Sequence, residues 1–198
     1  MKDTTPYRER PKSEIAHEQA CMRAIFAKAL PVSFIFEAFG GIGKTAQVLA
    51  ERFPSSRILA ADIDEECVRL YNDLQLDYAD CIHTDARTLL SQTCTLPYQW
   101  GVSLDFNRFT IMDLMDRREG QWKVDLIDAV VQRKPKWVQI TDSAIRYLHL
   151  NYFRYGCVNP GSEEYIQVLS NRLNVRWGLT YQTHSCYYAA SYLLLTLT

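Results

Sequence analysis

The sequence predicts an α/β protein with a doubly wound, mainly parallel seven-stranded sheet, an antiparallel C-terminal strand and helices on both faces. Three observations lead to this prediction. Short apolar runs alternate with helical segments between residues 32 and 142, a glycine cluster follows the first run, and two further β segments occur near the C-terminus. Short strands separated by helices are typical of parallel sheets that are covered on both faces.

The first elements follow from apolar periodicity and from the glycines. An approximate helical stripe from Ile15 to Leu30 predicts a helix over 13–30, which Ser13 is placed to cap. The apolar run at 32–37 predicts the first strand, and the helix at 44–53 begins where the glycine cluster ends. The same alternation predicts a strand at 57–62 and a helix at 65–74.

The later elements continue this pattern. We expect strands at 79–84, 100–105 and 137–142, a short helix directly after Asp85, and helices at 124–133 and 162–173. The segments 178–184 and 187–198 predict an antiparallel hairpin at the sheet edge, joined tightly around Ser185 and Cys186. The charged segment 1–12 carries Pro6 and Pro11 and is expected to be a flexible arm before a single domain at 13–198.

Composition excludes several classes of partner. The 22 basic and 23 acidic residues give a net charge of -1, so no global field would draw the chain to nucleic acid or to an anionic membrane. No apolar run approaches the roughly 18 residues of a membrane span. The six cysteines are scattered without the spacing of a zinc site. We therefore expect a cytoplasmic protein with reduced thiols, no metal and no membrane partner; its oligomeric state stays open.

The glycine cluster lies in the stretch F-I-F-E-A-F-G-G-I-G-K-T-A, residues 34–46, between an apolar strand and a helix. Gly41 and Gly43 are placed where a ligand must approach the backbone closely, and the following helix start offers N–H groups and a positive dipole end. Three interpretations remain open: a plain strand-to-helix turn, a phosphate-binding P-loop ending in Gly43-Lys44-Thr45, or a site for a cationic nucleoside.

Two observations favour the cationic nucleoside. The P-loop pattern GxxxxGK[ST] requires glycine at position 38, where this chain has Ala38, and the adjacent Glu37 carboxylate is unfavourable beside a triphosphate. Asp62 ends the second expected strand about 20 residues beyond the glycines, where a carboxylate can accept hydrogen bonds from both ribose hydroxyls. Asp64 is better placed to cap the next helix.

On these residues the chain resembles the class I S-adenosylmethionine-dependent methyltransferases over residues 13–198. Three segments carry the resemblance to motif I, the ribose motif and the adenine motif: Glu37-Ala-Phe-Gly-Gly-Ile-Gly, Ala61-Asp62-Ile63-Asp64 and His83-Thr84-Asp85-Ala86. The terminal hairpin also resembles the sixth and seventh strands of that family. Lys44 is not a family hallmark, so a nucleotide-binding P-loop protein remains the alternative.

The resemblance implies S-adenosyl-L-methionine as cofactor and a role for each matching residue. Glu37 would serve the methionine ammonium, Asp62 the ribose and Asp85 the adenine amine. Ile63 would pack on the adenine and the Ala86 N–H would reach its ring. Phe39, Gly41 and Gly43 belong to the same cofactor-binding loop.

The acceptor side is less defined. Asp105 and Asn107 follow the fourth expected strand and Asp142 ends the fifth, so these three are the candidate catalytic residues at the carboxyl ends of the strands. His149, Tyr152 and His184 are further candidate acid/base groups, although a structural role is the commoner one for a single histidine.

The methyl acceptor itself is unidentified. The [DN]PP[YF] motif of amino-methylating DNA enzymes is absent because both prolines are missing after Asp105, and no Pro-Cys pair supports cytosine chemistry. Nucleic acid, protein and small molecules stay open as acceptors. A methyltransferase-like subunit that binds cofactor without turnover is a further alternative.

Overall fold

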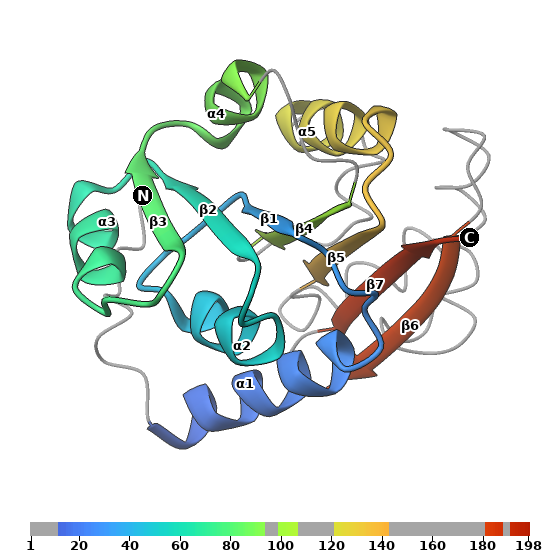
Figure 1. Cartoon of the computed structure of the whole chain (residues 1–198), viewed down its shortest axis with the longest axis horizontal. Coiled ribbons are helices and arrows are strands. Elements are labelled where there is room, and N and C mark those ends of the chain that lie inside the picture. Colours follow the sequence, from blue (N-terminus) through green and yellow to red (C-terminus); the bar gives the residue numbers. More distant parts are fainter. Residues whose placement is uncertain (1–11, 94–98, 107–120, 143–180, 188–190) are drawn as a thin grey trace, which may run out of the picture.

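The computed structural model describes residues 12–93, 99–106, 121–142, 181–187 and 191–198. These residues form five helices and seven strands in a single sheet (Figure 1). The helices are α1 (Lys12–Phe26), α2 (Lys44–Arg52), α3 (Glu65–Asn72), α4 (Ala86–Gln92) and α5 (Gln121–Gln132). The strands are β1 (Phe34–Glu37), β2 (Arg57–Asp62), β3 (Ala79–His83), β4 (Trp100–Phe106), β5 (Trp137–Asp142), β6 (Tyr181–Tyr187) and β7 (Ser191–Leu197).

The strand order is β3-β2-β1-β4-β5-β7-β6. Strands β3 to β5 are parallel, and β7 pairs antiparallel with both β5 and β6. The predicted fold class is therefore confirmed. Since the chain winds outwards in opposite directions from the adjacent strands β1 and β4, the carboxyl ends of these strands border a crevice in which such folds bind ligands.

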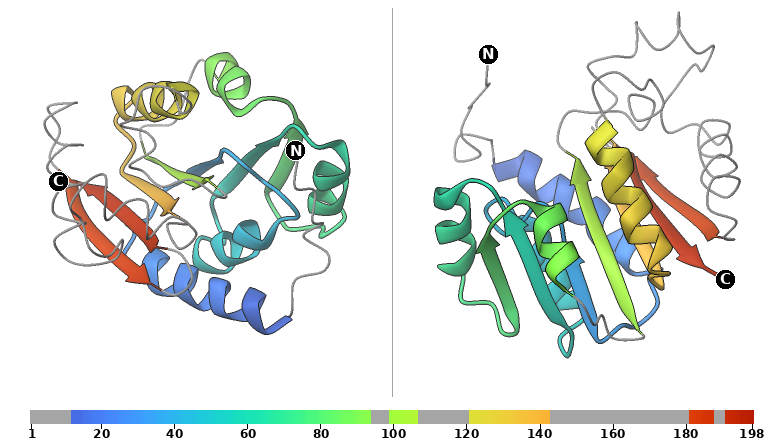
Figure 2. Two further views of the ribbon diagram at one scale, coloured as in Figure 1. Left: turned by 180° about the vertical axis from the view of Figure 1, so that it is seen from behind. Right: turned by 90° about the horizontal axis from the view of Figure 1, so that it is seen from above.

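Helices cover both faces of the sheet, as the right view of Figure 2 shows with α4 and α5 in front and α1 behind. One buried cluster joins Phe36 and Val102 to α4 and α5, and a second joins Ile35 and Ile58 to α1 and α2. Every residue of β1 is buried. Neighbouring residues of one strand thus face opposite apolar layers, which explains why these strands are continuous apolar runs.

The first helix differs from its predicted bounds at both ends. It begins at Lys12, so Ser13 lies inside the first turn and is not its cap. It ends at Phe26, and the Arg52 side chain of α2 donates to the carbonyl oxygens of Phe26 and Ala29 at 3.0 and 3.3 Å. A helix end needs such donors for its free carbonyls. The end of α1 is thus satisfied by a long-range contact, which local periodicity does not contain.

The hairpin also differs from the prediction. Ser185 and Cys186 lie inside β6, where they pair with Leu193 and Tyr192 of β7. The chain cannot reverse at residues whose backbone is engaged in this ladder, so the predicted turn position is wrong, and the connection falls at 188–190, outside the described residues. The predicted helix at 162–173 and the arm before Lys12 also lie outside them.

The core on the α1 and α2 face is organised around Trp137, which is fully buried. The centroid of its ring lies 5.6 Å from that of the Phe26 ring and 5.7 Å from that of the Phe53 ring, on which it stacks. Its indole N–H donates to the Leu30 carbonyl at 3.0 Å. Gly101 on β4 provides the space, because a β-carbon there would overlap the Trp137 ring. No described helix is long and apolar enough to cross a bilayer.

We expect Gly101→Ala to lower the free energy of unfolding by about 1–3 kcal/mol, because the added methyl group forces the Trp137 ring out of a well-packed position. Urea unfolding followed by tryptophan fluorescence measures the change. The double variant Gly101→Ala with Trp137→Phe is the control for the clash, since the smaller ring accommodates the methyl group. A single variant as stable as the wild type would contradict this packing.

Candidate functional site

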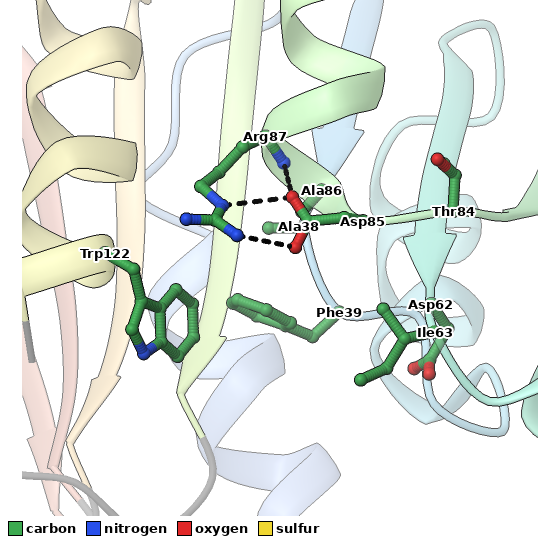
Figure 3. A pocket seen from close by; sticks show the side chains of 9 residues that line it. All are labelled: Ala38, Phe39, Asp62, Ile63, Thr84, Asp85, Ala86, Arg87 and Trp122. Atoms are coloured by element: carbon green, nitrogen blue, oxygen red, sulfur yellow. Dashed lines mark hydrogen bonds and ion pairs between the residues drawn. The ribbon is translucent and has the colours of Figure 1, made fainter.

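A pocket of about 340 Å³ opens at the carboxyl ends of β1, β2 and β3. Figure 3 shows the side chains that line it. They are Ala38, Phe39, Asp62, Ile63, Thr84, Asp85, Ala86, Arg87 and Trp122. Five of the residues that the sequence assigns to the cofactor line this pocket, namely Phe39, Asp62, Ile63, Asp85 and Ala86. Glu37, Gly41 and Gly43 do not line it, and Arg87 and Trp122 were not predicted from the sequence.

Hydrogen bonds within the protein hold the glycine loop in place. The backbone N–H of Gly40 donates to the Ala61 carbonyl at 2.9 Å, and that of Gly43 donates to the Gly40 carbonyl at 3.0 Å. The N–H of Gly41 donates to Asp62 Oδ2 at 2.8 Å. These three N–H groups are therefore engaged by oxygens of the chain itself, whereas a P-loop uses its backbone N–H groups to cradle phosphates.

Asp62 is the residue that joins the loop to β2. Its Oδ2 accepts from Gly41, and its Oδ1 accepts from the N–H of Asp64 at 2.9 Å. A carboxylate has about four acceptor positions, so each oxygen can accept one further hydrogen bond from a ligand in the pocket. Asp64 caps α3 as predicted, because its side chain accepts from the N–H groups of Glu66 and Cys67.

Apolar and aromatic side chains flank the same pocket. Ile63 is 74% exposed, which is unusual for a large apolar side chain, and it lines the pocket beside Asp62. Phe39 lies between Ile63 and Trp122 in the view of Figure 3. Its ring packs edge to face against the Trp122 ring, with 6.0 Å between the ring centroids. A flat apolar ring bound here would cover Ile63. Trp122 was missed because its contact with Phe39 crosses from α5 to the loop after β1.

Asp85 lies at the start of α4. Its Oδ1 accepts from the N–H groups of Arg87 and Thr88 at 2.9 and 3.4 Å, and its two oxygens accept from the Arg87 guanidinium at 3.1 and 3.2 Å (Figure 3). The hydrogen bond from the Arg87 side chain is the main reason that the pKa of Asp85 is lowered. The carboxylate is therefore a permanent acceptor at the pocket wall at neutral pH.

Glu37, at the end of β1, is buried with 1% of its surface exposed. Its Oε2 accepts from the Tyr71 hydroxyl of α3 at 3.1 Å, while its Oε1 has no hydrogen-bond partner among the described residues. Burial raises the pKa of Glu37 well above its ordinary value. The Tyr71 hydrogen bond opposes this effect, and the nearby charges of Asp105 and Asp62 add to it.

The backbone conformation and the packing at Gly43 both favour glycine. Its φ of 79° is in the left-handed region, and a β-carbon there would overlap the Leu74 side chain and lie 3.4 Å from the Tyr71 ring. Tyr71 of α3 and Leu74, which follows α3, thus approach the backbone at Gly43 closely, and ligand contact at Gly43 stays a prediction. Tyr71 was missed because its partner Glu37 is 34 residues away in the sequence.

The acceptor candidates are only partly described. Asp105 lies at the end of β4 next to Thr141 of β5, is half-buried, and is close enough to Glu37 to affect its pKa. Asp142 is the last residue of β5 and pairs through its backbone with Phe106, but its side chain lies outside the description, as do Asn107, His149 and Tyr152 entirely.

His184 does not belong to the crevice. It lies in the edge strand β6, and its pKa is lowered first by burial and then by the charge of Lys28, which follows α1. A second polar feature, also missed from the sequence, lies on β4 and β5: Ser103 donates to Gln139 at 2.7 Å, and Gln139 donates to Thr141 at 2.9 Å. These side chains are buried and satisfy one another next to the strand position of Asp105.

No family model matches the chain, and no curated protein matches its sequence. Solved structures do match. An enzyme of Klebsiella pneumoniae assigned as an O-methyltransferase is 12% identical and covers 98% of this chain and 83% of its own, with a TM-score of 0.59. The plantazolicin methyltransferase BpumL, solved with a desmethylPZN analogue and SAH, is 12% identical and covers 96% and 87%, with a TM-score of 0.58.

The 23S rRNA methyltransferase ErmE is also similar, at 15% identity over 96% of this chain and 69% of its own, with a TM-score of 0.54. The chain has the class I methyltransferase fold. Within this methyltransferase fold the pocket lies at the carboxyl ends of β1 to β3, next to the switch in strand order. At these identities the likeness is one of architecture.

We expect Arg87→Ala to raise the pKa of Asp85 towards the ordinary range of an aspartate, about 3.9, because the side-chain hydrogen bond is its largest lowering influence. Carbon-detected NMR titration of the carboxyl group measures the shift. Arg69→Ala is the matched control, since that arginine pairs with Glu66 and Asp73 on α3. An Asp85 titration unchanged by Arg87→Ala would mean that the backbone N–H groups alone hold the carboxylate.

Proposed function

We propose that the chain is an S-adenosyl-L-methionine-dependent methyltransferase whose acceptor is unidentified. The observation that carries the proposal is the position of Asp62. Its carboxylate is held by the glycine loop and retains acceptor capacity in the same pocket as the exposed Ile63 and the ionised Asp85. This arrangement suits a nucleoside, because Asp62 can accept from a ribose, Ile63 can pack on a base and Asp85 can accept from an exocyclic amine.

The residues also fit the amino-acid end of this cofactor. Glu37 has a buried oxygen to which no described residue donates, and such an oxygen is costly unless a donor reaches it. The cofactor carries an ammonium and a sulfonium, so it brings positive charge to a region that contains Glu37, Asp62 and Asp105. Phe39 and Trp122 add an apolar wall to the pocket.

The P-loop alternative is less favourable for two physical reasons. The N–H groups of Gly40, Gly41 and Gly43 already donate to oxygens of the chain, so they are not available to phosphate oxygens. The carboxyl groups of Asp62 and Asp105 are close enough to Glu37 to raise its pKa, so three carboxyl groups gather here. A triphosphate would add like charge to this cluster.

When bound, the cofactor supplies an activated methyl group, and the protein must align the acceptor for in-line displacement. Asp105, at the end of β4, is the residue to which we assign the hydrogen bond from a nucleophile, with Asn107 and Asp142 as further candidates. The similar structures act on different molecules, as the names plantazolicin methyltransferase and 23S rRNA methyltransferase indicate. The acceptor of this chain stays open between nucleic acid, protein and small molecule.

Cytoplasmic localisation remains part of this proposal. The six cysteines are scattered along the sequence without the spacing of a zinc site, which suits the reducing environment of that compartment.

We expect S-adenosylhomocysteine to raise the melting temperature, because a ligand that binds only the folded chain stabilises it by about 2.7 kcal/mol at a hundred times its Kd. Mg-ATP should leave the melting temperature unchanged.

Asp62→Ala should weaken the binding of S-adenosylhomocysteine at least about tenfold, or about 1.4 kcal/mol, since it removes the ribose acceptor and the anchor of Gly41. Glu51→Ala, an exposed carboxylate paired with Arg23, is the control.

If Mg-ATP raises the melting temperature of the wild type and Lys44→Ala abolishes this effect, the proposal is wrong and the P-loop alternative is supported. Methyl transfer is tested separately with a radiolabelled methyl donor and a panel of RNA, DNA, protein and small-molecule acceptors. Cofactor binding without transfer to any member of a broad panel would favour a binding subunit that has lost turnover.

We expect Asp105→Ala to reduce methyl transfer about 100-fold or more, a loss typical of removing a group that acts on the nucleophile, while changing the Kd for S-adenosylhomocysteine much less. Single-turnover transfer to the acceptor found in that panel measures the rate, and calorimetry measures the Kd. An equal loss of both would place Asp105 on the cofactor instead of the acceptor.

A further inference from the structure

The interaction between Glu37 and Tyr71 has no role in the nucleoside pocket described above. Glu37 and Tyr71 are each 1% exposed, and neither side chain lines that pocket. A buried carboxyl group is costly unless its oxygens are paired, yet within the described part of the chain only Oε2 of Glu37 is bonded, to the Tyr71 hydroxyl. The described residues thus leave one carboxyl oxygen at the end of β1 buried and without a partner.

We propose that Tyr71 is a positioning residue that holds Glu37 with Oε1 free to accept a hydrogen bond from the ammonium group of the cofactor's amino-acid end. This inference rests on the proposed function, because it assigns the interaction to one part of the cofactor. It adds a residue of α3, remote in sequence from the glycine loop, to the recognition of that part.

The packing around Tyr71 keeps its hydroxyl in place. A β-carbon on Gly40 would lie 3.2 Å from the Tyr71 ring and one on Gly43 would lie 3.4 Å from it, so the ring fills the space beneath the glycine loop. This close packing against the loop restrains the ring and so keeps its hydroxyl near Glu37. Burial and the Glu37 charge raise the pKa of Tyr71 far above its ordinary value, so the hydroxyl remains a donor at every working pH.

The surroundings of Glu37 favour its protonated form until a cation arrives. Acidic groups face it from three strands, Asp62 on β2, Cys81 on β3 and Asp105 on β4, while Tyr71 faces it from α3. Lys44 begins α2, and its amine nitrogen is shielded from solvent. Burial raises the pKa of the Cys81 thiol to about 12, so this group is neutral at working pH.

The sign of the pH dependence follows from these groups. An ammonium binds best to an ionised carboxylate, and burial raises the pKa of Glu37, so the protonated fraction of this carboxyl group must lose its proton before it can pair with the ammonium. Affinity for a ligand that carries the ammonium should therefore increase as pH rises towards the pKa of Glu37. The Tyr71 hydrogen bond favours the ionised form, so its loss should move this rise to higher pH.

The test compares two ligands that share adenine and ribose. S-adenosylhomocysteine carries the ammonium and 5′-methylthioadenosine lacks it. Calorimetric Kd values are measured from about pH 6 to about pH 8.5 for the wild type, Tyr71→Phe and the control Tyr78→Phe, whose side chain is 70% exposed on the loop before β3. We expect Tyr71→Phe to weaken S-adenosylhomocysteine about tenfold near neutral pH and to change 5′-methylthioadenosine less than about twofold.

The outcomes separate the two proposals. Equal weakening of both ligands by Tyr71→Phe would mean that the ring only supports the loop, and unchanged binding of both would mean that the hydroxyl has no role; either result overturns the inference. If the wild type binds neither ligand, the proposed function fails. If it binds 5′-methylthioadenosine with the same Kd as S-adenosylhomocysteine at all pH values, the nucleoside site stands and this inference fails.

A second variant keeps the test decisive if Tyr71→Phe does not fold. Glu37→Gln preserves the volume and the acceptor for Tyr71 but cannot ionise. We expect it to remove both the preference for S-adenosylhomocysteine and the pH dependence of its Kd. A Glu37→Gln variant that keeps the wild-type pH profile would overturn the inference, because the titrating group would then be a different one.

Discussion

The site depends on one hydrogen bond, from the backbone N–H of Gly41 to the carboxylate of Asp62. It ties the loop after β1 to the end of β2, and a second bond from Gly40 to Ala61 supports the same junction. Because parallel strands end at one edge of the sheet, two segments about 20 residues apart are brought together there. The same bond disfavours a phosphate-binding role for the loop, since an N–H that already serves a carboxylate is not available to a phosphate.

Charge is distributed unevenly around this junction. On the pocket side, Asp85 is kept ionised by Arg87, so the wall offers a fixed acceptor. Beneath the loop, Glu37 is buried and its pKa is raised, so its neutral form is favoured more than that of Asp85. The two carboxyl groups differ because one has a guanidinium partner and partial solvent access, while the other has a tyrosine hydroxyl and no access. A ligand with a neutral base and a cationic tail is complementary to both.

Much of the fold could be predicted because it depends on local pattern. Apolar runs of β-strand length alternate with helical segments, and this alternation together with the right-handed crossover rule leaves few topologies. Asp64 and Asp85 were predicted beside their helix starts for the same reason, since a cap acts within three residues of itself. The errors occurred where distant contacts are made: Arg52 binds the carbonyl at the end of α1, and the β6–β7 ladder extends past Cys186, so the hairpin turn lies beyond it.

The sequence by itself determined in which order strands and helices follow one another along the chain. It also determined the candidate cofactor residues that line the pocket, because strand ends and motif spacing are local properties; these are Phe39, Asp62, Ile63, Asp85 and Ala86. Only the tertiary structure decided that Gly43 is packed against α3, that Trp122 and Arg87 complete the pocket wall, and that Tyr71 bonds to Glu37. Most of these contacts join elements that are far apart along the chain. The contribution of Arg87 depends instead on the direction in which its side chain points. No spacing rule encodes such a contact, because it depends on how the helices pack on the finished sheet.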